Sequence, residues 1–201
     1  MPDDSSLAIV IVSYNVRAEL EACLRSLAGN TEPFETVITV VDNGSADGTL
    51  DMMGRDWPTV PVIEAGANLG FARANNLGIR ATRSEFVLLL NPDTIVPPGA
   101  VATLLRGLAA HPDAAAAGPR LVDERGFPEL SFGWTIGPLG ELAQKVVGDL
   151  YRRRVRAVVR RVDRWTRMAG TREWVSGACL AARRTDLEAV GLLDERYFMY
   201  T

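Results

Sequence analysis

The sequence predicts an α/β fold built on a mostly parallel β-sheet, from four apolar runs and the helical segments between them. Each run is short, rich in β-branched residues or in leucine, and ends in polar or turn-forming residues. Such runs are typical of strands that are buried on both faces of a sheet. The runs cover residues 7–12, 37–41, 60–63 and 86–90. Strands that alternate with helices at this spacing form βαβ units, which pair their strands in parallel.

Helices are expected between and after these strands. Apolar residues recur at i, i+3, i+4 and i+7 after the first strand, and Gly29 follows as a stop signal. Residues 71–83 carry Phe71, Ala74 and Leu77 along one side of a predicted helix before the fourth strand, and residues 99–110 are expected to form a further helix. Residues 114–122 are expected to form another strand. The first apolar set is Leu20, Cys23, Leu24 and Leu27.

The C-terminal part of the chain is more varied. Residues 126–140 are rich in glycine, proline and aromatic residues and are expected to be irregular, whereas residues 141–168 have helical character. Residues 174–182 are predicted to form one buried segment. Residues 185–188 have the spacing of a capping box, which predicts a short helix that stops at Gly191.

The composition is that of an ordinary globular domain. With 201 residues, 47% of them hydrophobic and 23% charged, the chain can bury a sizeable core. Its net charge of −3 argues against general nucleic-acid binding. The pattern of Cys23, Cys179 and the single His111 indicates neither a metal cluster nor a disulfide framework, which favours a reducing, cytoplasmic setting. The acidic start does not resemble a secretory signal, and no apolar run approaches the roughly 18 residues of a membrane span.

Polar residues follow each of the four predicted strands. In open parallel sheets, ligands bind beyond the carboxyl ends of the strands, so we expect these residues to meet at one edge of the sheet. The four clusters are Ser13-Tyr14-Asn15, Asp42-Asn43-Gly44-Ser45, Asn68-Leu69-Gly70-Phe71-Ala72 and Asn91-Pro92-Asp93-Thr94.

Two other nucleotide-binding classes are disfavoured at the first strand. A dinucleotide-binding enzyme needs G-x-G-x-x-G there, so that the backbone can approach a pyrophosphate at a helix N-terminus. This chain has no glycine before Gly29. A sugar-phosphate nucleotidyltransferase needs a glycine-rich loop with Arg or Lys to hold a triphosphate, and residues 13–17 do not provide one. The nucleotidyltransferase therefore remains a less supported alternative.

In order and spacing, the polar clusters and later segments resemble those of family 2 glycosyltransferases. The resemblance covers nearly the whole chain apart from about residues 124–170. It implies the A-type glycosyltransferase (nucleotide-diphospho-sugar transferase) fold, as one domain with a nucleotide-sugar-binding half (residues 1–122) and an acceptor-side half (residues 123–201). The matching segments are residues 12–15, 41–49, 68–72, 75–78, 90–94, 174–178 and 193–199.

The resemblance implies a donor site at the strand ends. Ser13, Tyr14 and Asn15 match the part of the nucleotide pocket beside base and ribose. Asp42 matches a carboxylate that accepts hydrogen bonds from a pyrimidine edge, which suits a uridine or thymidine donor. The alternative for its loop is a plain turn and helix cap at residues 43–48.

Three residues after the third strand match further donor-site positions. Asn68 and Arg73 are expected to contact the donor, and Gly70 is expected to let the backbone come close to the ligand. For Arg73 the equal alternative is an exposed helix face.

The resemblance also implies a divalent cation, Mg²⁺ or Mn²⁺, held by Asp93. Asn91-Pro92-Asp93 stands where the family has a D-x-D whose last carboxylate binds a cation that bridges the donor diphosphate. A hard cation with oxygen ligands stabilises the negative charge on the departing diphosphate. Asn91 replaces the first acid, as in the rhamnosyltransferase-like branch of the family, so one charged protein ligand is expected. The alternative is a plain turn after the strand.

The acceptor side is less complete. In the family, the general base is the Asp of a Glu-Asp pair just beyond a Phe-Met-Tyr-like segment, and this sequence ends immediately short of that pair. We therefore expect a C-terminally truncated domain whose base lies just beyond Thr201, with Asp194 as the fallback candidate. For Trp174 a core position is an equal alternative to stacking on a sugar. The acceptor-side matches are Trp174, Gly177, Ala178 and Asp194.

Residues 145–172 are strongly basic, with ten Lys or Arg and two Asp. An apolar stripe at helical spacing accompanies the charge, so a basic amphipathic helix is expected. Such a helix suits anionic headgroups or a polyprenyl-diphosphate acceptor at the membrane surface. An ordinary solvated helix is the equal alternative. The stripe comprises Tyr151, Val155, Val158, Val159, Val162 and Trp165.

Together these features predict an inverting glycosyltransferase. It would move a sugar, such as rhamnose, from a UDP- or dTDP-sugar to a hydroxyl of a saccharide or polyprenyl-diphosphate-linked acceptor. Its expected setting is cell-wall or surface polysaccharide assembly at the inner face of the membrane. A non-catalytic nucleotide-sugar-binding module is the alternative from a different class.

Overall fold

The computed structural model describes residues 5–123, 125–129, 132–133, 149–151, 153 and 155–198. The chain divides into two compact units. The first comprises Met1–Ala117 and Gly177–Thr201, and the second comprises Gly118–Ser176. These boundaries differ from those of the two functional halves expected above, because the last strand and helix return to the sheet of the first unit.

A six-stranded sheet forms the centre of the first unit, in the order β3-β2-β1-β4-β8-β5. Strands β1 to β4 are mutually parallel. They are β1 (Ser6–Ser13), β2 (Glu35–Asp42), β3 (Val62–Glu64) and β4 (Phe86–Leu90). Strand β8 (Cys179–Arg183) runs antiparallel to both β4 and the short β5 (Ala116–Ala117). This is the mostly parallel sheet that the sequence predicts, so the expected fold class is confirmed.

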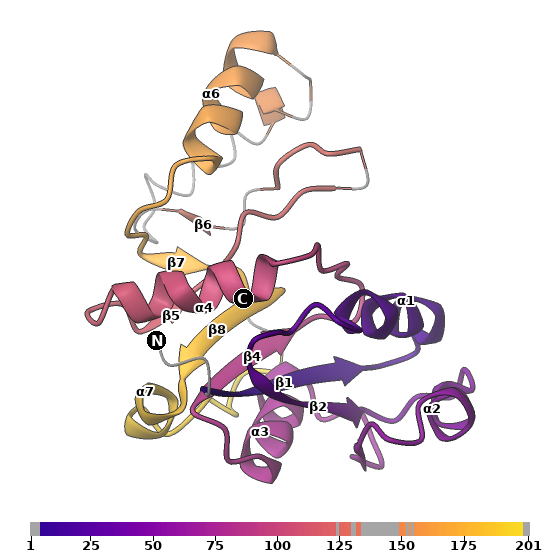
Figure 1. Ribbon diagram of the computed structural model, residues 1–201. Coiled ribbons are helices and arrows are strands. Elements are labelled where there is room, and N and C mark those ends of the chain that lie inside the picture. The colour runs from indigo at the N-terminus through magenta and orange to yellow at the C-terminus, as the bar shows by residue number, and fades with distance from the viewer. Residues whose placement is uncertain are drawn as a thin grey trace. The chain divides into compact units, whose positions relative to one another are not determined.

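Helices cover both faces of this sheet. Helices α3 and α7 lie on one face, and α1 and α4 lie on the opposite face (Figure 1). A further helix, α2 (Thr49–Asp56), connects β2 to β3. The other four are α1 (Arg17–Leu27), α3 (Phe71–Ala81), α4 (Ala100–Ala110) and α7 (Arg184–Ala189).

The core is made by strands that are apolar on both faces. All five residues of β4 are buried, and so are residues 7–11 of β1. On the α3 face, one buried cluster joins strands β1, β2 and β4 to α3 through Ala74 and Ile79. Gly78 lets α3 approach the sheet closely, because a Cβ at this position would overlap the side chain of Val10. Helix α3 is therefore held at a fixed depth against β1.

The second unit has its own small hydrogen-bonded elements. Strand β6 (Phe132–Gly133) pairs antiparallel with β7 (Trp174–Val175). Helix α6 (Arg156–Thr166) is tied to the chain that precedes it by the Arg120 guanidinium, which donates to Asp163 at 2.8 Å and to the Thr166 hydroxyl at 3.2 Å.

Several predicted elements need correction. The strand expected over residues 114–122 is only two residues long. The segment 174–182, predicted as one, is two strands, because a turn at Gly177 and Ala178 sends β7 and β8 to different sheets. The predicted irregular segment 126–140 contains β6.

The ends of the predicted helices also differ from those in the structure. Helix α7 begins at Arg184 with no side-chain cap, so the capping box expected at residues 185–188 is wrong, although the helix itself forms. Gly191 follows α7 with φ of 83°, as a stop signal requires. Residues 141–148 of the segment predicted as helical lie outside the described residues. Among the residues that are described, no helix is both long and apolar enough to cross a membrane.

Candidate functional site

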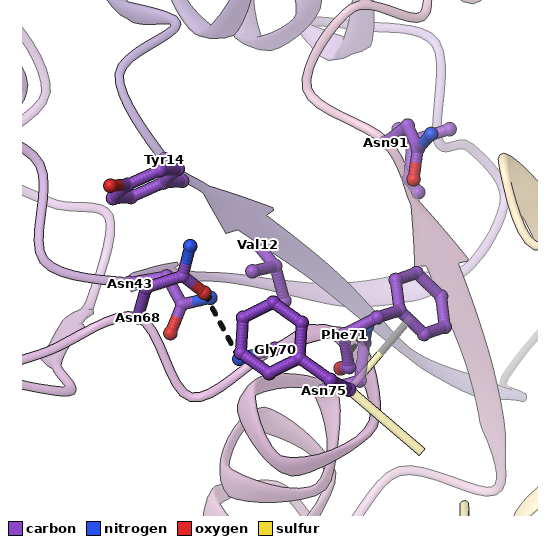
Figure 2. A pocket seen from close by; sticks show the side chains of 10 residues that line it. Val12, Tyr14, Asn43, Asn68, Gly70, Phe71, Asn75 and Asn91 are labelled. Carbon is purple, nitrogen blue, oxygen red and sulfur yellow. Dashed lines mark hydrogen bonds between the residues drawn. The ribbon is translucent and has the colours of Figure 1, made fainter. Parts of the chain in front are cut away.

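A pocket of the first unit opens between the carboxyl ends of β1 and β4 (Figure 2). The chain passes from β1 outward to β2 and β3, and then returns to β4 on the other side of β1. Connections therefore leave β1 and β4 in opposite directions, which opens a crevice between them. Each of the four strand ends contributes to the lining, so the predicted convergence is confirmed. These residues are Val12, Tyr14, Asn43, Asn68, Leu90 and Asn91.

A chain of amide hydrogen bonds shapes one wall of the pocket. The Asn43 side chain donates to Asn68 Oδ1 at 2.9 Å and accepts from the Leu69 backbone N–H at 2.9 Å. Asn68 Oδ1 also accepts from the Gly70 N–H at 3.0 Å. Asn43 is buried and Asn68 is exposed, so the network runs from the core to the pocket surface.

Ser13 and Asp42, at the ends of β1 and β2, are not part of the pocket lining. They face each other in the β1–β2 register, and their side chains are 0% and 2% exposed. Asp42 Oδ2 accepts from the backbone N–H groups of Gly44 and Ser45 at 3.2 and 3.1 Å, which forms the turn. Asp42 Oδ1 and Ser13 Oγ are buried and have no hydrogen-bond partner among the described residues. Buried polar atoms without a partner are unusual in a folded protein.

Asn15 and Asp47 join the loops after β1 and β2. Asn15 has φ of 54°, and its Oδ1 accepts from the Ala46 N–H at 2.7 Å. Asp47 accepts from the Arg17 N–H at 2.8 Å and from the Thr49 N–H at 3.1 Å. The turn-and-cap interpretation of this loop is therefore correct, and it coexists with the buried Asp42. Tyr14, 46% exposed, lines the pocket between the two loops.

Asn91 and Asp93 occupy different positions after β4. Asn91 lines the pocket, and its N–H donates to the Ala178 carbonyl at 2.8 Å. Asp93 lies in the exposed turn that follows and is not part of the pocket lining. Among the described residues, no three His, Cys, Asp or Glu side chains gather into a metal-binding group. Asp93 by itself would offer a cation one protein carboxylate. Mg²⁺ accepts this arrangement, because it retains several waters and is commonly held by one or two carboxylates plus substrate phosphates.

Two thiols lie beneath this region. Burial raises the pKa of Cys23 to about 12, and the nearby charge of Asp93 adds to the effect. Burial likewise raises the pKa of Cys179 to about 12. Both thiols are therefore neutral at physiological pH and behave as small apolar groups rather than as metal ligands.

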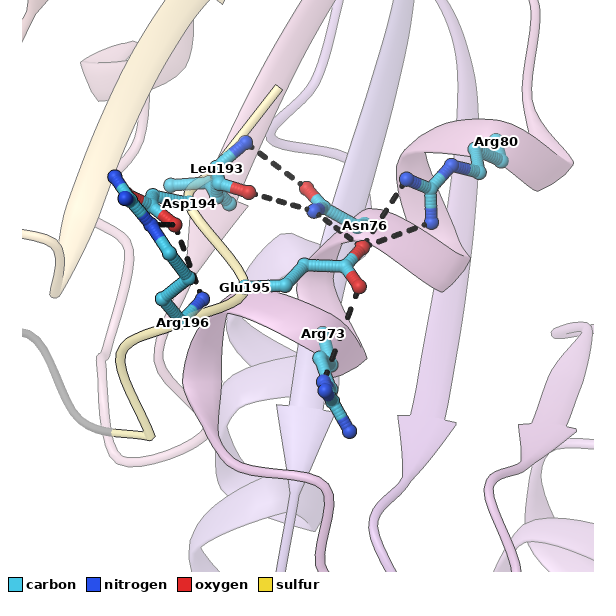
Figure 3. Close-up of polar contacts among 7 residues, drawn as sticks. All are labelled: Arg73, Asn76, Arg80, Leu193, Asp194, Glu195 and Arg196. Carbon is cyan, nitrogen blue, oxygen red and sulfur yellow. Dashed lines mark hydrogen bonds and ion pairs between the residues drawn. The ribbon is translucent and has the colours of Figure 1, made fainter. Parts of the chain in front are cut away.

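Arg73 and Asp194 lie outside the pocket lining. Arg73 is on the exposed side of α3, with its Nε 3.9 Å from a carboxylate oxygen of Glu195. Asp194 binds Arg196, which donates from its backbone and its guanidinium (Figure 3). These hydrogen bonds, the side-chain bond first, lower the pKa of Asp194 to about 2. The pairing with Arg196 therefore makes Asp194 a weaker proton acceptor than an ordinary aspartate.

The acceptor-side residues are divided between the two units. Trp174 lies in β7 of the second unit and is half-buried. Gly177 and Ala178 belong to the first unit, where the Ala178 carbonyl contacts Asn91.

Sequence reasoning did not single out three pocket residues. Phe71 and Asn75 come from the first turns of α3, and Phe198 comes from the C-terminal segment. The Phe71 N–H donates to the Phe198 carbonyl at 2.8 Å. Gly70 does allow a close backbone approach, as expected, but the group that approaches is Phe198. The signal was available in part, since Phe71, Asn75 and Phe198 all lie in segments that carry the family resemblance.

The fold and the pocket define an α/β protein of the A-type glycosyltransferase architecture. The chain belongs to glycosyl transferase family 2, whose model matches residues 8–184. It is 33% identical over 205 residues to an N-acetylglucosaminyl-diphospho-decaprenol L-rhamnosyltransferase of Mycobacterium tuberculosis (strain ATCC 25618 / H37Rv), which covers 96% of this chain and 66% of that protein. It is also 26% identical over 211 residues to the low-salt glycan biosynthesis hexosyltransferase Agl10 of Haloferax volcanii, which covers 100% of this chain and 59% of that protein.

Solved structures share the fold. A mannosyltransferase from Pyrobaculum calidifontis, in complex with GDP-Man and Mn²⁺, aligns with a TM-score of 0.59 at 21% identity over 96% of this chain and 48% of its own. Residues 1–349 of S. aureus TarS align with a TM-score of 0.57 at 16% identity over 94% of this chain and 50% of that one. The chain thus spans about half of these solved chains and just under two thirds of the M. tuberculosis relative.

Proposed function

We propose that this chain is the donor-binding part of an inverting glycosyltransferase that moves a sugar from a pyrimidine-nucleotide donor to an acceptor hydroxyl in glycan or cell-wall synthesis. The observation that carries the proposal is the pocket at the carboxyl ends of β1 and β4, which is lined by residues that follow all four parallel strands. Ser13 and Asp42, each with a buried, unsatisfied oxygen, stand at the ends of β1 and β2 but outside the pocket lining. We propose that a nucleotide base supplies the hydrogen-bond partner that the buried Asp42 oxygen lacks. One TarS structure, which aligns at a TM-score of 0.53, is a complex with UDP, and this supports a uridine or thymidine donor.

Asp42 is proposed to read the base. Its Oδ2 is committed to the turn, whereas its buried Oδ1 is an acceptor without a donor. The N3–H of uracil or thymine is such a donor. Ser13 Oγ, on the neighbouring strand, can donate or accept and would add to the same recognition. Leaving these buried atoms unpaired costs about 1–3 kcal/mol each, so a matching base gains affinity from them.

Asp93 is proposed to hold Mg²⁺ or Mn²⁺ against the donor diphosphate. The bound cation would stabilise the charge that develops on the leaving diphosphate. Asn91 contributes a neutral amide at the pocket, and its backbone is fixed by Ala178. Asp93 is thus the one charged ligand that the turn after β4 provides.

The sugar and the acceptor are proposed from the relatives. The M. tuberculosis relative is named for the transfer of L-rhamnose to N-acetylglucosaminyl-diphospho-decaprenol. We propose a rhamnose-like donor sugar and a polyprenyl-diphosphate-linked or related saccharide acceptor for the whole protein. Residues 1–122 would then serve mainly the donor and residues 123–201 mainly the acceptor, with Phe198 as the one described residue of the second part that lines the donor pocket. No described carboxylate is assigned as the base, since Asp194 is held by Arg196.

Helix α6 is proposed to contact an anionic membrane surface through residues 145–172. Four residues of the predicted apolar stripe are partly or fully buried in this helix, and Asp163 and Thr166 are buried to a similar degree; the four are Val158, Val159, Val162 and Trp165. On a helix of 3.6 residues per turn, the exposed arginines occupy an arc of about 140° that does not overlap these positions. The stripe is therefore used for packing, and the proposed contact is electrostatic. The exposed arginines of α6 are Arg156, Arg160, Arg161 and Arg164.

Calorimetric titration tests the proposed donor class. The chain should bind UDP and dTDP with Mg²⁺ at least about tenfold more tightly than GDP, a difference of about 1.4 kcal/mol. The matched control is the same series with EDTA, where the pyrimidine preference should persist but overall affinity should fall. The proposal is wrong if the three nucleotides bind with equal affinity, or if the protein binds none of them.

A further inference from the structure

The C-terminal segment of residues 193–198 is anchored to α3 by a buried amide. Asn76 on α3 is 0% exposed. Its Nδ2 donates to the Leu193 carbonyl and to Glu195 Oε1, both at 2.9 Å, and its Oδ1 accepts from the Leu193 N–H at 3.1 Å (Figure 3). One side chain thus satisfies both backbone groups of Leu193 and orients the Glu195 carboxylate.

Glu195 extends this anchor across the surface of α3. Its Oε1 accepts from both terminal nitrogens of Arg80 at 3.1 Å, and its Oε2 lies 3.9 Å from Arg73 Nε. The hydrogen bond from Asn76 and those from Arg80 lower the pKa of Glu195 below its usual range. The arginines are more than half exposed, so their ion pairs alone contribute little. The shared contact with the buried Asn76 is what distinguishes Glu195 from a surface ion pair.

The other end of the segment forms the pocket wall. The Phe198 carbonyl accepts from the Phe71 N–H at 2.8 Å, at the start of α3. Gly70 lies directly beneath, because a Cβ there would overlap the Phe198 carbonyl and would lie 2.8 Å from Phe198 Cδ2. Asn76 and Phe71 are five residues apart on the helix, about 7.5 Å. The segment therefore contacts α3 at two points, and only the second reaches the pocket.

We propose that Glu195 is a positioning residue for the nucleotide pocket: with Asn76 it holds residues 193–198 along α3 and so places Phe198 as a pocket wall that contacts the bound ligand. The ligand part rests on the proposed nucleotide-binding function. Phe198 is 58% exposed, which leaves ring surface for a ligand to cover. The Phe198 carbonyl also accepts the hydrogen bond of the Phe71 N–H. This N–H group is therefore not available to bind a phosphate of the nucleotide sugar.

Hydrogen exchange of the ligand-free protein tests the anchor by itself. In Glu195→Ala, the backbone amide protons of Phe71 and Leu193 should exchange at least about fivefold faster, because the segment opens more often. Glu195→Gln, which keeps an acceptor for Asn76, should restore most of the protection. Arg196→Ala is the matched control in the same segment, since Arg196 contacts Asp194 and not α3. Unchanged exchange at Phe71 in Glu195→Ala would overturn the proposal.

A double-variant cycle with UDP and Mg²⁺ tests the link to the pocket. Glu195→Ala and Phe198→Ala should each weaken UDP binding about fivefold, while the combined variant should be no weaker than Phe198→Ala alone. If the combined variant instead loses UDP affinity by the product of the two single losses, Glu195 acts independently of Phe198, and the proposal is overturned. If the unaltered protein binds no pyrimidine nucleotide, the proposed function fails, while the exchange result still decides whether Glu195 holds Phe198.

Discussion

Ser13 and Asp42 are paired across β1 and β2, and each has a buried side-chain oxygen with no hydrogen-bond partner among the described residues. In Asp42 only Oδ1 lacks a partner, because Oδ2 accepts the hydrogen bonds from Gly44 and Ser45 that close the turn. The carboxylate therefore has one oxygen that closes the turn and one that is left for the proposed recognition of the base. The two can be separated by substitution.

Asp42→Asn should replace the hydrogen-bond acceptor proposed to recognise the pyrimidine base by a donor, and it should leave the turn intact. The Asn carbonyl can still accept from Gly44 and Ser45, while its amide puts a donor where Asp42 has an acceptor. UDP and dTDP should bind at least about tenfold more weakly, and GDP should be unaffected. Calorimetry with the three nucleotides measures this. An equal loss for all three would mean that Asp42 only supports the loop.

Asp93→Ala should remove the metal-dependent part of donor affinity. At saturating Mg²⁺, UDP affinity should fall at least about tenfold, and in EDTA the variant and the unaltered protein should bind alike. Asp113→Ala, at another exposed aspartate, is the control and should change neither value. Unchanged affinity of Asp93→Ala in Mg²⁺ would remove Asp93 as the cation ligand.

Gly70→Ala and Gly29→Ala should differ in cost, although both glycines have positive φ, 80° and 73°. At Gly29 nothing lies within 4 Å of the added Cβ, so only backbone strain of about 1 kcal/mol is expected. At Gly70 the Cβ meets Phe198, so the loss should be at least about 1 kcal/mol larger. Urea denaturation of the two variants gives the comparison. Equal losses would mean that residues 193–198 move aside at no cost.

The Asp194–Arg196 pair predicts a pH-dependent contribution to stability. The pKa of Asp194 falls from its ordinary value of 3.8 to about 2 in the folded protein. A group with a depressed folded pKa stabilises the protein above its unfolded pKa and loses that effect as the pH falls through the folded one. The difference in Tm between Asp194→Asn and the unaltered protein should therefore shrink between about pH 4 and pH 2. Thermal denaturation across this range measures it. A constant difference would show that the pair is not formed in solution.

Binding of α6 to membranes should be electrostatic and reversible by salt. Liposomes with anionic lipid should sediment the protein at low salt and release it at about 0.5 M salt, where the Debye length is only a few ångströms. Replacing Arg156, Arg160 and Arg164 by Gln should abolish sedimentation. A variant with the same charge change in the first unit, at Arg25, Arg55 and Arg106, should still bind. If the α6 variant still sediments with the liposomes, α6 is an ordinary solvated helix and the proposed membrane contact is wrong.

Much of the fold was predictable because its signals are local. The runs that became β1, β2 and β4 are apolar on both faces, and only a parallel sheet covered by helices buries such strands. The strand-end motifs were predictable for the same reason, since a turn residue acts within a few positions of itself. Errors arose where apolar character continued through a turn. Residues 174–182 are the clearest case, because hydropathy does not reveal that β7 and β8 pair with different partners.

By itself, the sequence determined the strands, the helix order and the polar residues at the strand ends. Only the tertiary structure decided which of those residues share a pocket and which are committed elsewhere. Asp194 is bound by Arg196, whereas Asn76 and Glu195, which are 119 positions apart, meet on α3 and bring Phe198 to the pocket. The physical reason is range: periodicity and turn chemistry act over a few residues, whereas such contacts exist only once the sheet has brought distant segments together.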